Sequence, residues 1–250
     1  MVRTLLVRGM LVGIVAGLVC FGFLKLYGEP QLDRALAFET QLEDAKAAAE
    51  KAGAGGHEDE RALVSRPVQA GIGLFTGVIV YCTAFGGLFG LAFAFAYGRV
   101  GANLTPQGVS ALLAAIGFVV VYLAPSLKYP ASPPAVGEAE TIGMRTALYF
   151  VMIALSLAAV VAATSLRRLL VPHLGGWNAT LVAGGCYAAL VAFAALALPA
   201  VEEVPGQFPA AVLWQFRIAS IGAQFIMWAT IGLLFGALAQ RDGRRSADGR

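Results

Sequence analysis

The sequence predicts an all-α integral membrane protein, a polytopic bundle of about six transmembrane helices with proline-stiffened loops on the non-cytoplasmic face. Of the 250 residues, 58% are hydrophobic and only 13% are charged, whereas soluble domains carry about 45–50% apolar and about 25% charged residues. The mean hydropathy is +0.74. Six long runs contain no charged residue, and about 20 residues of helix span a bilayer. These runs are 9–24, 67–98, 100–127, 146–166, 174–201 and 218–240.

The same features exclude several other classes of protein. Low charge and high hydrophobicity exclude disorder, and the runs lack the polar–apolar alternation of an outer-membrane barrel. The net charge of +3 is too small and too scattered for nucleic-acid binding. Cys20, Cys82 and Cys186 lie inside apolar runs without a CxxC spacing, so we interpret them as buried small residues rather than as disulfides.

Each apolar run is assigned one helix, and together they form a single membrane domain over residues 1–240. No small-residue cleavage site follows the first run, so we interpret it as a retained span rather than a signal peptide. Glycines four residues apart in the first and last spans predict close helix packing. The expected spans lie near 6–26, 70–97, 107–124, 146–166, 179–198 and 213–238, with a long extracytoplasmic loop at 28–66 containing a short helix at 32–52, and a cytoplasmic tail at 241–250.

The distribution of basic residues predicts the orientation. Short loops on the cytoplasmic side of a membrane carry an excess of lysine and arginine. One face holds the basic residues of both chain ends and of two loops: Arg3, Arg8, Arg99, Arg167, Arg168, Arg241, Arg244, Arg245 and Arg250. The short loops of the other face hold only Lys128, Arg145 and Arg217. Both termini are therefore expected in the cytoplasm.

In this topology the acidic residues gather outside. Thirteen of the 15 lie on the non-cytoplasmic face, and only Asp242 and Asp248 lie inside. A negative outer vestibule raises the local concentration of cations. The alternative is that acids are tolerated outside simply because basic residues are retained inside. The outer acids are Glu29, Asp33, Glu39, Glu43, Asp44, Glu50, Glu58, Asp59, Glu60, Glu138, Glu140, Glu202 and Glu203.

Three outer loops, at 28–34, 127–145 and 198–217, are the candidate site. Their prolines fix the backbone, and a stiff loop loses less entropy when it binds a ligand. We expect carboxylates at the ends of three spans to face a divalent cation, namely Glu29, Asp33, Glu138, Glu202 and Glu203. Lys128, Tyr129, Pro130, Arg145, Trp214 and Arg217 are expected to line or orient this vestibule. Alternatively, the acids pair with Lys128, Arg145 and Arg217 and only pin the loops.

No catalytic pattern occurs in the sequence. The metalloprotease, nucleophile-elbow, phosphate-binding and dinucleotide signatures are all missing. His57 and His173 fall on opposite faces of the membrane in the predicted topology. We therefore expect a protein that is not an enzyme and that holds no permanent cofactor, and any energy for transport must come from elsewhere.

Four stretches resemble one known family: GEPQLDRALAFE (28–39), VSRPVQAGIGLFTG (64–77), LKYPASPPAVGEAETIGMRTALYF (127–150) and LPAVEEVPGQFPAAVLWQFRIAS (198–220). From about residue 3 to residue 240 the chain is similar to the CbtA family of predicted cobalt transporter subunits. The family is usually described with five spans and often has a histidine-rich first loop. Here only His57 stands in that loop, beside Glu58, Asp59 and Glu60, the residues expected to capture metal there.

The resemblance implies a subunit of a bacterial inner-membrane transporter that takes up Co(II), with nickel as an alternative cargo, in support of cobalamin synthesis. Co(II) is then the transported ion. The resemblance also implies a small CbtB-like partner with one span and metal-binding histidines, embedded in the same lipid bilayer. The alternative function is a non-transporting membrane scaffold or assembly subunit whose loops dock a partner protein.

Overall fold

The computed structural model describes residues 2–51, 65–99, 104–201 and 203–248. Of the residues described, 88% are helical, and none of them lies in a strand. The predicted all-helical class is therefore confirmed. The chain divides into two compact units. Unit 1 comprises Met1–Ala115, Pro133–Ala135 and Gln207–Arg250, and unit 2 comprises Ile116–Ser132 and Val136–Gly206.

Five helical segments in the described part of the chain are long and apolar enough to cross a bilayer, one fewer than the six predicted. The difference arises because α7 (Ile142–Ala197) contains two of the predicted spans, those at 146–166 and 179–198. The five segments are Val2–Ala45, Arg66–Ala96, Pro106–Lys128, Ile142–Ala197 and Ala210–Asp242.

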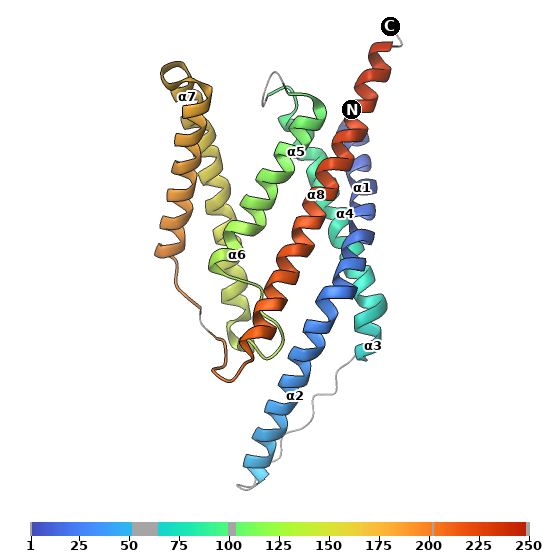
Figure 1. Cartoon of the computed structure of the whole chain (residues 1–250), viewed down its shortest axis with the longest axis vertical. Coiled ribbons are helices and arrows are strands. Elements are labelled where there is room, and N and C mark those ends of the chain that lie inside the picture. The colour runs from blue at the N-terminus through green and yellow to red at the C-terminus, as the bar shows by residue number, and fades with distance from the viewer. Residues whose placement is uncertain (1, 52–64, 100–103, 202, 249–250) are drawn as a thin grey trace. The chain divides into compact units, whose positions relative to one another are not determined.

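α7 reverses direction at Gly175, which explains how one helix covers two spans (Figure 1). Gly175 has φ 74° and ψ 165°, a backbone conformation that is essentially restricted to glycine. The two arms are joined by hydrogen bonds. The hydroxyl oxygens of Ser156 and Tyr187 lie 2.9 Å apart, and Arg167 Nε donates to Thr180 Oγ1 at 2.8 Å. α7 is therefore a helical hairpin within unit 2.

The first helix runs without interruption past the end of the predicted first span. α1 (Val2–Phe23) continues through the π-helical turn η1 (Leu24–Gly28) into α2 (Glu29–Lys51). The wide turn ends two residues before Pro30, which lacks the amide proton of a regular helical hydrogen bond. The predicted proline-stiffened loop at 28–34 is wrong, because these residues lie on a helix. Glu29 and Asp33 consequently lie one turn apart on the same face.

Glycines let α1 pack directly on α4 (Leu74–Ala96) in unit 1, as their spacing predicted. α4 follows the short helix α3 (Arg66–Val68) and the π-helical turn η2 (Gln69–Gly73). A Cβ atom added at Gly13 would lie 2.8 Å from the Cα atom of Thr83. A Cβ atom added at Gly86 would lie 2.8 Å from the Cα atom of Gly13 and closer still to the Gly9 carbonyl oxygen. The two backbones are therefore in contact, as small residues allow in lipid.

α8 (Ala210–Asp248) completes the core of unit 1. Its Phe235 is fully buried and makes edge-to-face contacts with Phe89 and Phe93 of α4. α5 (Pro106–Gly117) begins the third long segment, which continues through η3 (Phe118–Leu123) and α6 (Ala124–Lys128). Within unit 1, Ser110 of α5 donates to the Gly232 carbonyl of α8 at 2.7 Å. A Cβ atom added at Gly232 would also meet the Ala114 side chain of α5, which confirms the predicted packing role of Gly232.

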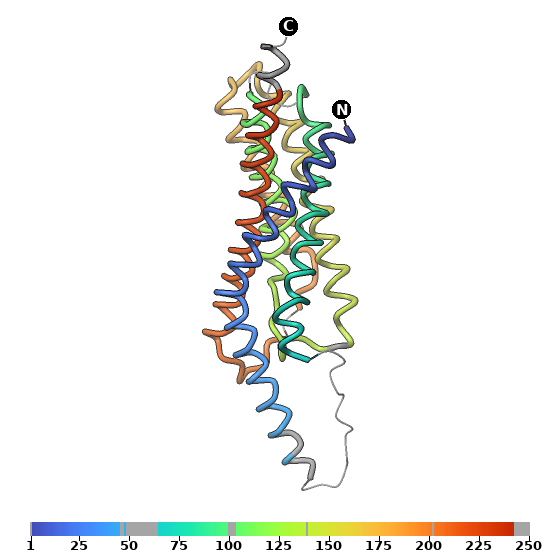
Figure 2. Tube along the Cα trace, turned by 90° about the vertical axis from the view of Figure 1, so that its right-hand side faces the viewer, coloured from blue at the N-terminus to red at the C-terminus, as the bar shows by residue number. Residues whose placement is uncertain are grey.

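The start of α1 and the last turns of α8 lie at the same end of unit 1 (Figure 2). There Arg8 of α1 forms an ion pair with Asp242 of α8. The continuous helix from Arg8 to Glu29 rises about 31 Å at 1.5 Å per residue. This length matches the hydrocarbon core of a bilayer, about 30 Å thick. Arg8 and Glu29 therefore lie at opposite ends of a segment that is just long enough to cross a membrane.

Candidate functional site

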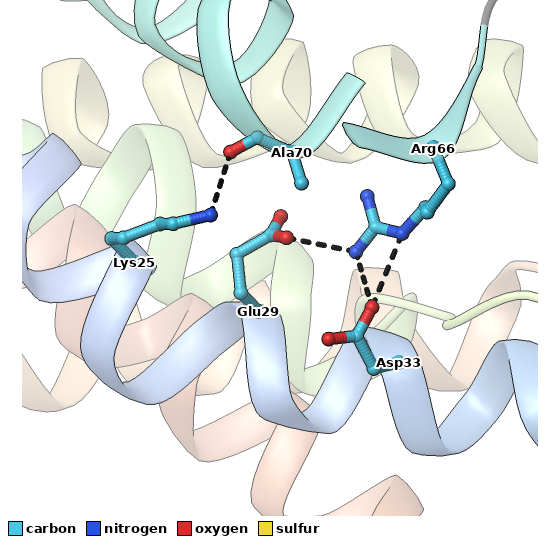
Figure 3. Close-up of polar contacts among 5 residues, drawn as sticks. All are labelled: Lys25, Glu29, Asp33, Arg66 and Ala70. Carbon is cyan, nitrogen blue, oxygen red and sulfur yellow. Dashed lines mark hydrogen bonds and ion pairs between the residues drawn. The ribbon is translucent and has the colours of Figure 1, made fainter. Parts of the chain in front are cut away.

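At the far end of α1 from Arg8, one arginine holds two carboxylates (Figure 3). Arg66 Nη2 lies 2.8 Å from Glu29 Oε2 and 2.8 Å from Asp33 Oδ1, and its Nε donates to the same Asp33 oxygen at 3.1 Å. One turn earlier, Lys25 Nζ donates to the Ala70 carbonyl at 3.0 Å. The contacts join the α1–α2 helix to the start of the second apolar segment. We call Glu29, Asp33 and Arg66 the carboxylate–arginine cluster.

The three members of this cluster differ in exposure. The Glu29 side chain is 9% exposed, that of Arg66 is 30% exposed and that of Asp33 is 63% exposed. A buried carboxylate is tolerated only with a charged or hydrogen-bonded partner, and Arg66 is that partner for Glu29. The two carboxylates and the guanidinium sum to one negative charge, which the Lys25 ammonium, one turn earlier on the same helix, offsets. The cluster therefore presents a paired buried acid beside an exposed acid that solvent cations can reach.

Helix geometry explains why these residues meet. Glu29 and Asp33 are four residues apart, so both side chains leave the same face of the helix. Arg66 is the first residue of α3 and precedes Pro67, which is well suited to the first turn of a helix because it has no amide proton to satisfy. The glycine contacts between α1 and α4 fix the two segments side by side. The cluster is therefore a consequence of the packing in unit 1.

Unit 2 contains a second acidic centre, around Glu203. Glu203 Oε2 accepts a hydrogen bond from the Glu138 amide at 2.9 Å and lies 3.5 Å from Arg145 Nε. The Thr141 hydroxyl first of all, then the Glu138 amide and the Arg145 guanidinium, hold the pKa of Glu203 below its ordinary value. Glu203 is therefore an anion at neutral pH, and its charge organises the turn at 138–141.

A glycine makes room for the arginine of this centre. Gly137 has φ 102°, which disfavours any side chain. A Cβ atom added there would lie 2.6 Å from Arg145 Nη2.

Tyr129 joins the loop before α7 to the loop after it, because its hydroxyl donates to the Pro199 carbonyl at 2.8 Å. Burial raises the pKa of Tyr129, so it remains a hydrogen-bond donor. The loops on either side of α7 are thus tied together.

Comparison with known proteins identifies the chain. The family described as probable cobalt transporter subunit (CbtA) matches residues 2–240. The chain belongs to the CbtA family. No curated protein and no solved structure matches it. The resemblance found in the sequence is confirmed over nearly the whole chain, and with five long apolar segments this CbtA-family chain is a multi-pass membrane protein.

The predicted metal-facing residues of this CbtA chain fall into both units. Glu29 and Asp33 belong to unit 1, and Glu138 and Glu203 belong to unit 2. Glu202 lies outside the described residues, as do the predicted capture residues His57, Glu58, Asp59 and Glu60. Within the described part of the chain, no three His, Cys, Asp or Glu side chains are grouped closely enough to hold a metal ion.

The residues expected to line the vestibule have different surroundings. Arg145 and Tyr129 join the Glu203 centre and its neighbouring loop. Lys128 lies 6.0 Å above the Tyr129 ring, and Pro130 follows half-buried. In α8, Trp214 is 66% exposed and Arg217 is half-buried. Glu203 lies within ion-pair distance of Arg145, which is one of the pairings considered in the alternative interpretation.

One functional residue was missed from the sequence. Arg66 was not among the predicted site residues, although its position directly before Pro67, at the start of an apolar run, was the available signal. Cys20 and Cys82 are each 2% exposed, as predicted.

Proposed function

We propose that this CbtA-family chain is the membrane subunit that conducts Co(II) inward across the bacterial inner membrane, supplying cobalamin synthesis. Its cation-facing residues are Glu29, Asp33, Glu138, Glu202 and Glu203. Nickel is the alternative cargo. The termini lie in the cytoplasm, the chain is not an enzyme, and its partner is a small single-span CbtB-like protein whose histidines deliver the metal.

The observation that carries this proposal is the carboxylate–arginine cluster. It combines a buried acid and an exposed acid at one end of a membrane-length helix. An exposed carboxylate at such a position attracts arriving cations. Carboxylates also bind divalent first-row metals. The exposed Asp33 is the group that an arriving Co(II) ion meets first.

Arg66 has a definite role in this proposal. Its guanidinium contacts both carboxylates, so the buried Glu29 has a charged partner. A divalent cation carries twice the charge of the guanidinium and displaces it from Asp33. Arg66 then keeps its bond to Glu29. The exposed Asp33 exchanges one cation for another, and the buried Glu29 is never left unpaired.

The second candidate is a scaffold protein that does not transport. The Glu203–Arg145 ion pair favours the scaffold, because this carboxylate contacts a basic residue and so holds a loop in place. In that case the carboxylate–arginine cluster serves only to hold α3 against the first helix. The two candidates differ in what the chain does with metal, and both predict a partner.

Radioactive cobalt accumulation distinguishes them. Cells lacking other cobalt uptake are given this chain alone, the companion alone, or both, with nickel added as competitor. The transporter proposal predicts uptake that requires this chain and is complete only with both proteins. No uptake in any strain, with the protein shown to be inserted, supports the scaffold.

A further inference from the structure

A groove of about 510 Å³ opens between α1 and α8 at the end of unit 1 where Arg8 pairs with Asp242. Its volume lies within the range of small-molecule sites, about 300–1,000 Å³. The groove is separate from the carboxylate–arginine cluster, which lies at the opposite end of α1. Five residues of α1 and one residue of α8 line it: Arg3, Thr4, Val7, Arg8, Leu11 and Leu238.

The lining of this groove changes from polar to apolar along α1. Its α1 residues are spaced by three and four positions, so they share one face of the helix. Arg3 and Thr4, at the outer end, are exposed. Farther in, Val7 is 47% exposed and Leu11 is 59% exposed, and Leu238 of α8 is 40% exposed. Over about 12 Å of helix, guanidinium and hydroxyl groups therefore give way to exposed aliphatic side chains.

This gradient coincides with the depth profile of a bilayer. Arg8 lies at one boundary of the membrane-length segment that ends at Glu29, and Leu11 lies about one turn farther toward its middle. Arg3 lies about 7.5 Å beyond Arg8 in the other direction, at 1.5 Å per residue. The headgroup layer is about 5–7 Å thick on each side of the hydrocarbon core. The arginine end of the groove is therefore at headgroup depth, and its leucine end reaches the acyl chains.

The charge of the groove is positive. The described residues that line it include two arginines and no acid. Asp242 compensates Arg8, whose side chain is 19% exposed. Within the described part of the chain, Arg3 forms no ion pair. Arg3 is therefore available to an anion, and Arg8 provides a second guanidinium that is already held in place.

We propose that this groove binds an anionic phospholipid, with the phosphate on Arg3, Thr4 and Arg8 and the start of an acyl chain on Leu11 and Leu238. Arginine suits phosphate because its planar guanidinium donates two parallel hydrogen bonds. Basic pockets between membrane helices bind lipid headgroups. A free phosphate ion would leave the aliphatic end of the groove uncovered, whereas a phospholipid covers both ends. The bound lipid bridges α1 and α8, and the inference does not depend on metal transport.

The test is native mass spectrometry of the purified full-length protein in detergent, titrated with phosphatidylglycerol. We expect phosphatidylglycerol to bind more tightly than phosphatidylcholine, whose headgroup is zwitterionic, and millimolar inorganic phosphate not to displace it. One basic residue close to anionic headgroups changes the affinity about fivefold. Arg3→Gln is therefore expected to weaken phosphatidylglycerol binding about fivefold and to leave phosphatidylcholine binding unchanged.

Arg99→Gln is the matched control. Gly90 of α4 packs on Leu5 of α1, so the end of α4 lies beside the start of α1. Arg99 follows α4 as an exposed arginine that does not line the groove. The control removes the same charge from the same end of unit 1, and we expect wild-type affinity for phosphatidylglycerol. Equal weakening by the two variants would indicate general attraction to a basic surface and would overturn the site.

A measurement on the unaltered protein guards against misfolded variants. Phenylglyoxal modifies exposed arginines, and mass spectrometry maps the modified positions. Phosphatidylglycerol should slow the modification of Arg3 and leave that of Arg99 unchanged, and phosphatidylcholine should slow neither. Equal affinity for the two lipids, displacement by inorganic phosphate, or a modification rate at Arg3 that does not respond to phosphatidylglycerol would overturn the proposal.

Discussion

Gly86→Leu is expected to abolish the folded form of unit 1. A Cβ atom at this position meets backbone on the opposite helix, namely the Gly9 carbonyl and the Gly13 Cα atom at 2.8 Å. Backbone cannot rotate away as a side chain can, so α1 and α4 must separate. Overpacking of a tight core typically lowers stability by about 1–3 kcal/mol. Because the added side chain meets backbone atoms here, we expect a loss at the upper end of this range or above it. The measurement is the yield of monodisperse protein after detergent extraction.

The matched control is Gly77→Leu in the same helix. Gly77 has nothing within 4 Å of an added Cβ atom, so the larger side chain meets open space. We expect wild-type yield for this variant. Equal yields for the two leucine variants would show that α1 and α4 are not in backbone contact at Gly86.

Arg66→Gln is expected to lower the free energy of unfolding by about 3 kcal/mol, the lower end of the cost of breaking a buried ion pair. The cost arises because the Glu29 side chain is 9% exposed and loses its charged partner. The lower end of the range applies because the Arg66 side chain itself is 30% exposed. Reversible denaturation in mixed micelles measures the change. The Glu29→Gln/Arg66→Gln double variant should recover most of the loss, since neither charge remains.

Asp33→Asn provides the comparison for Arg66. The Asp33 side chain is 63% exposed, and exposed ion pairs contribute about 0–1 kcal/mol. We expect a correspondingly small change in stability. If Asp33→Asn destabilised the protein as much as Arg66→Gln, the stabilising effect of Arg66 would not come mainly from its ion pair with the buried Glu29.

The fold was largely predictable from the sequence because membrane helices are encoded locally. Uncharged runs of sufficient length identified the spans, and the glycine spacing in α1 identified the face that contacts α4. The predicted loop at 28–34 was wrong because Pro30 was interpreted as a helix breaker. The wide turn η1 lets the helix continue past it. Similarly, two predicted spans form one bent helix because Gly175 turns the chain without a loop.

The site was less predictable because its contacts are between residues distant in sequence. Glu29 and Asp33 were identified by their charge and position, but their partner Arg66 lies across the segment 52–64. Glu203 was identified as metal-facing, and its close contact with Arg145 had been considered only as the alternative.

The most direct test of the central claim, that this chain moves Co(II) through an acidic entrance, is cobalt uptake by a variant with all five candidate acids replaced by amides. The changes are Glu29→Gln, Asp33→Asn, Glu138→Gln, Glu202→Gln and Glu203→Gln, with the companion present. Glu43→Gln/Asp44→Asn, on the exposed face of α2, is the matched control. We predict an initial rate reduced at least about tenfold, as expected when a steering field is lost, and a control rate equal to that of the wild type. Unchanged uptake by the five-fold variant, in folded and inserted protein, would contradict the claim.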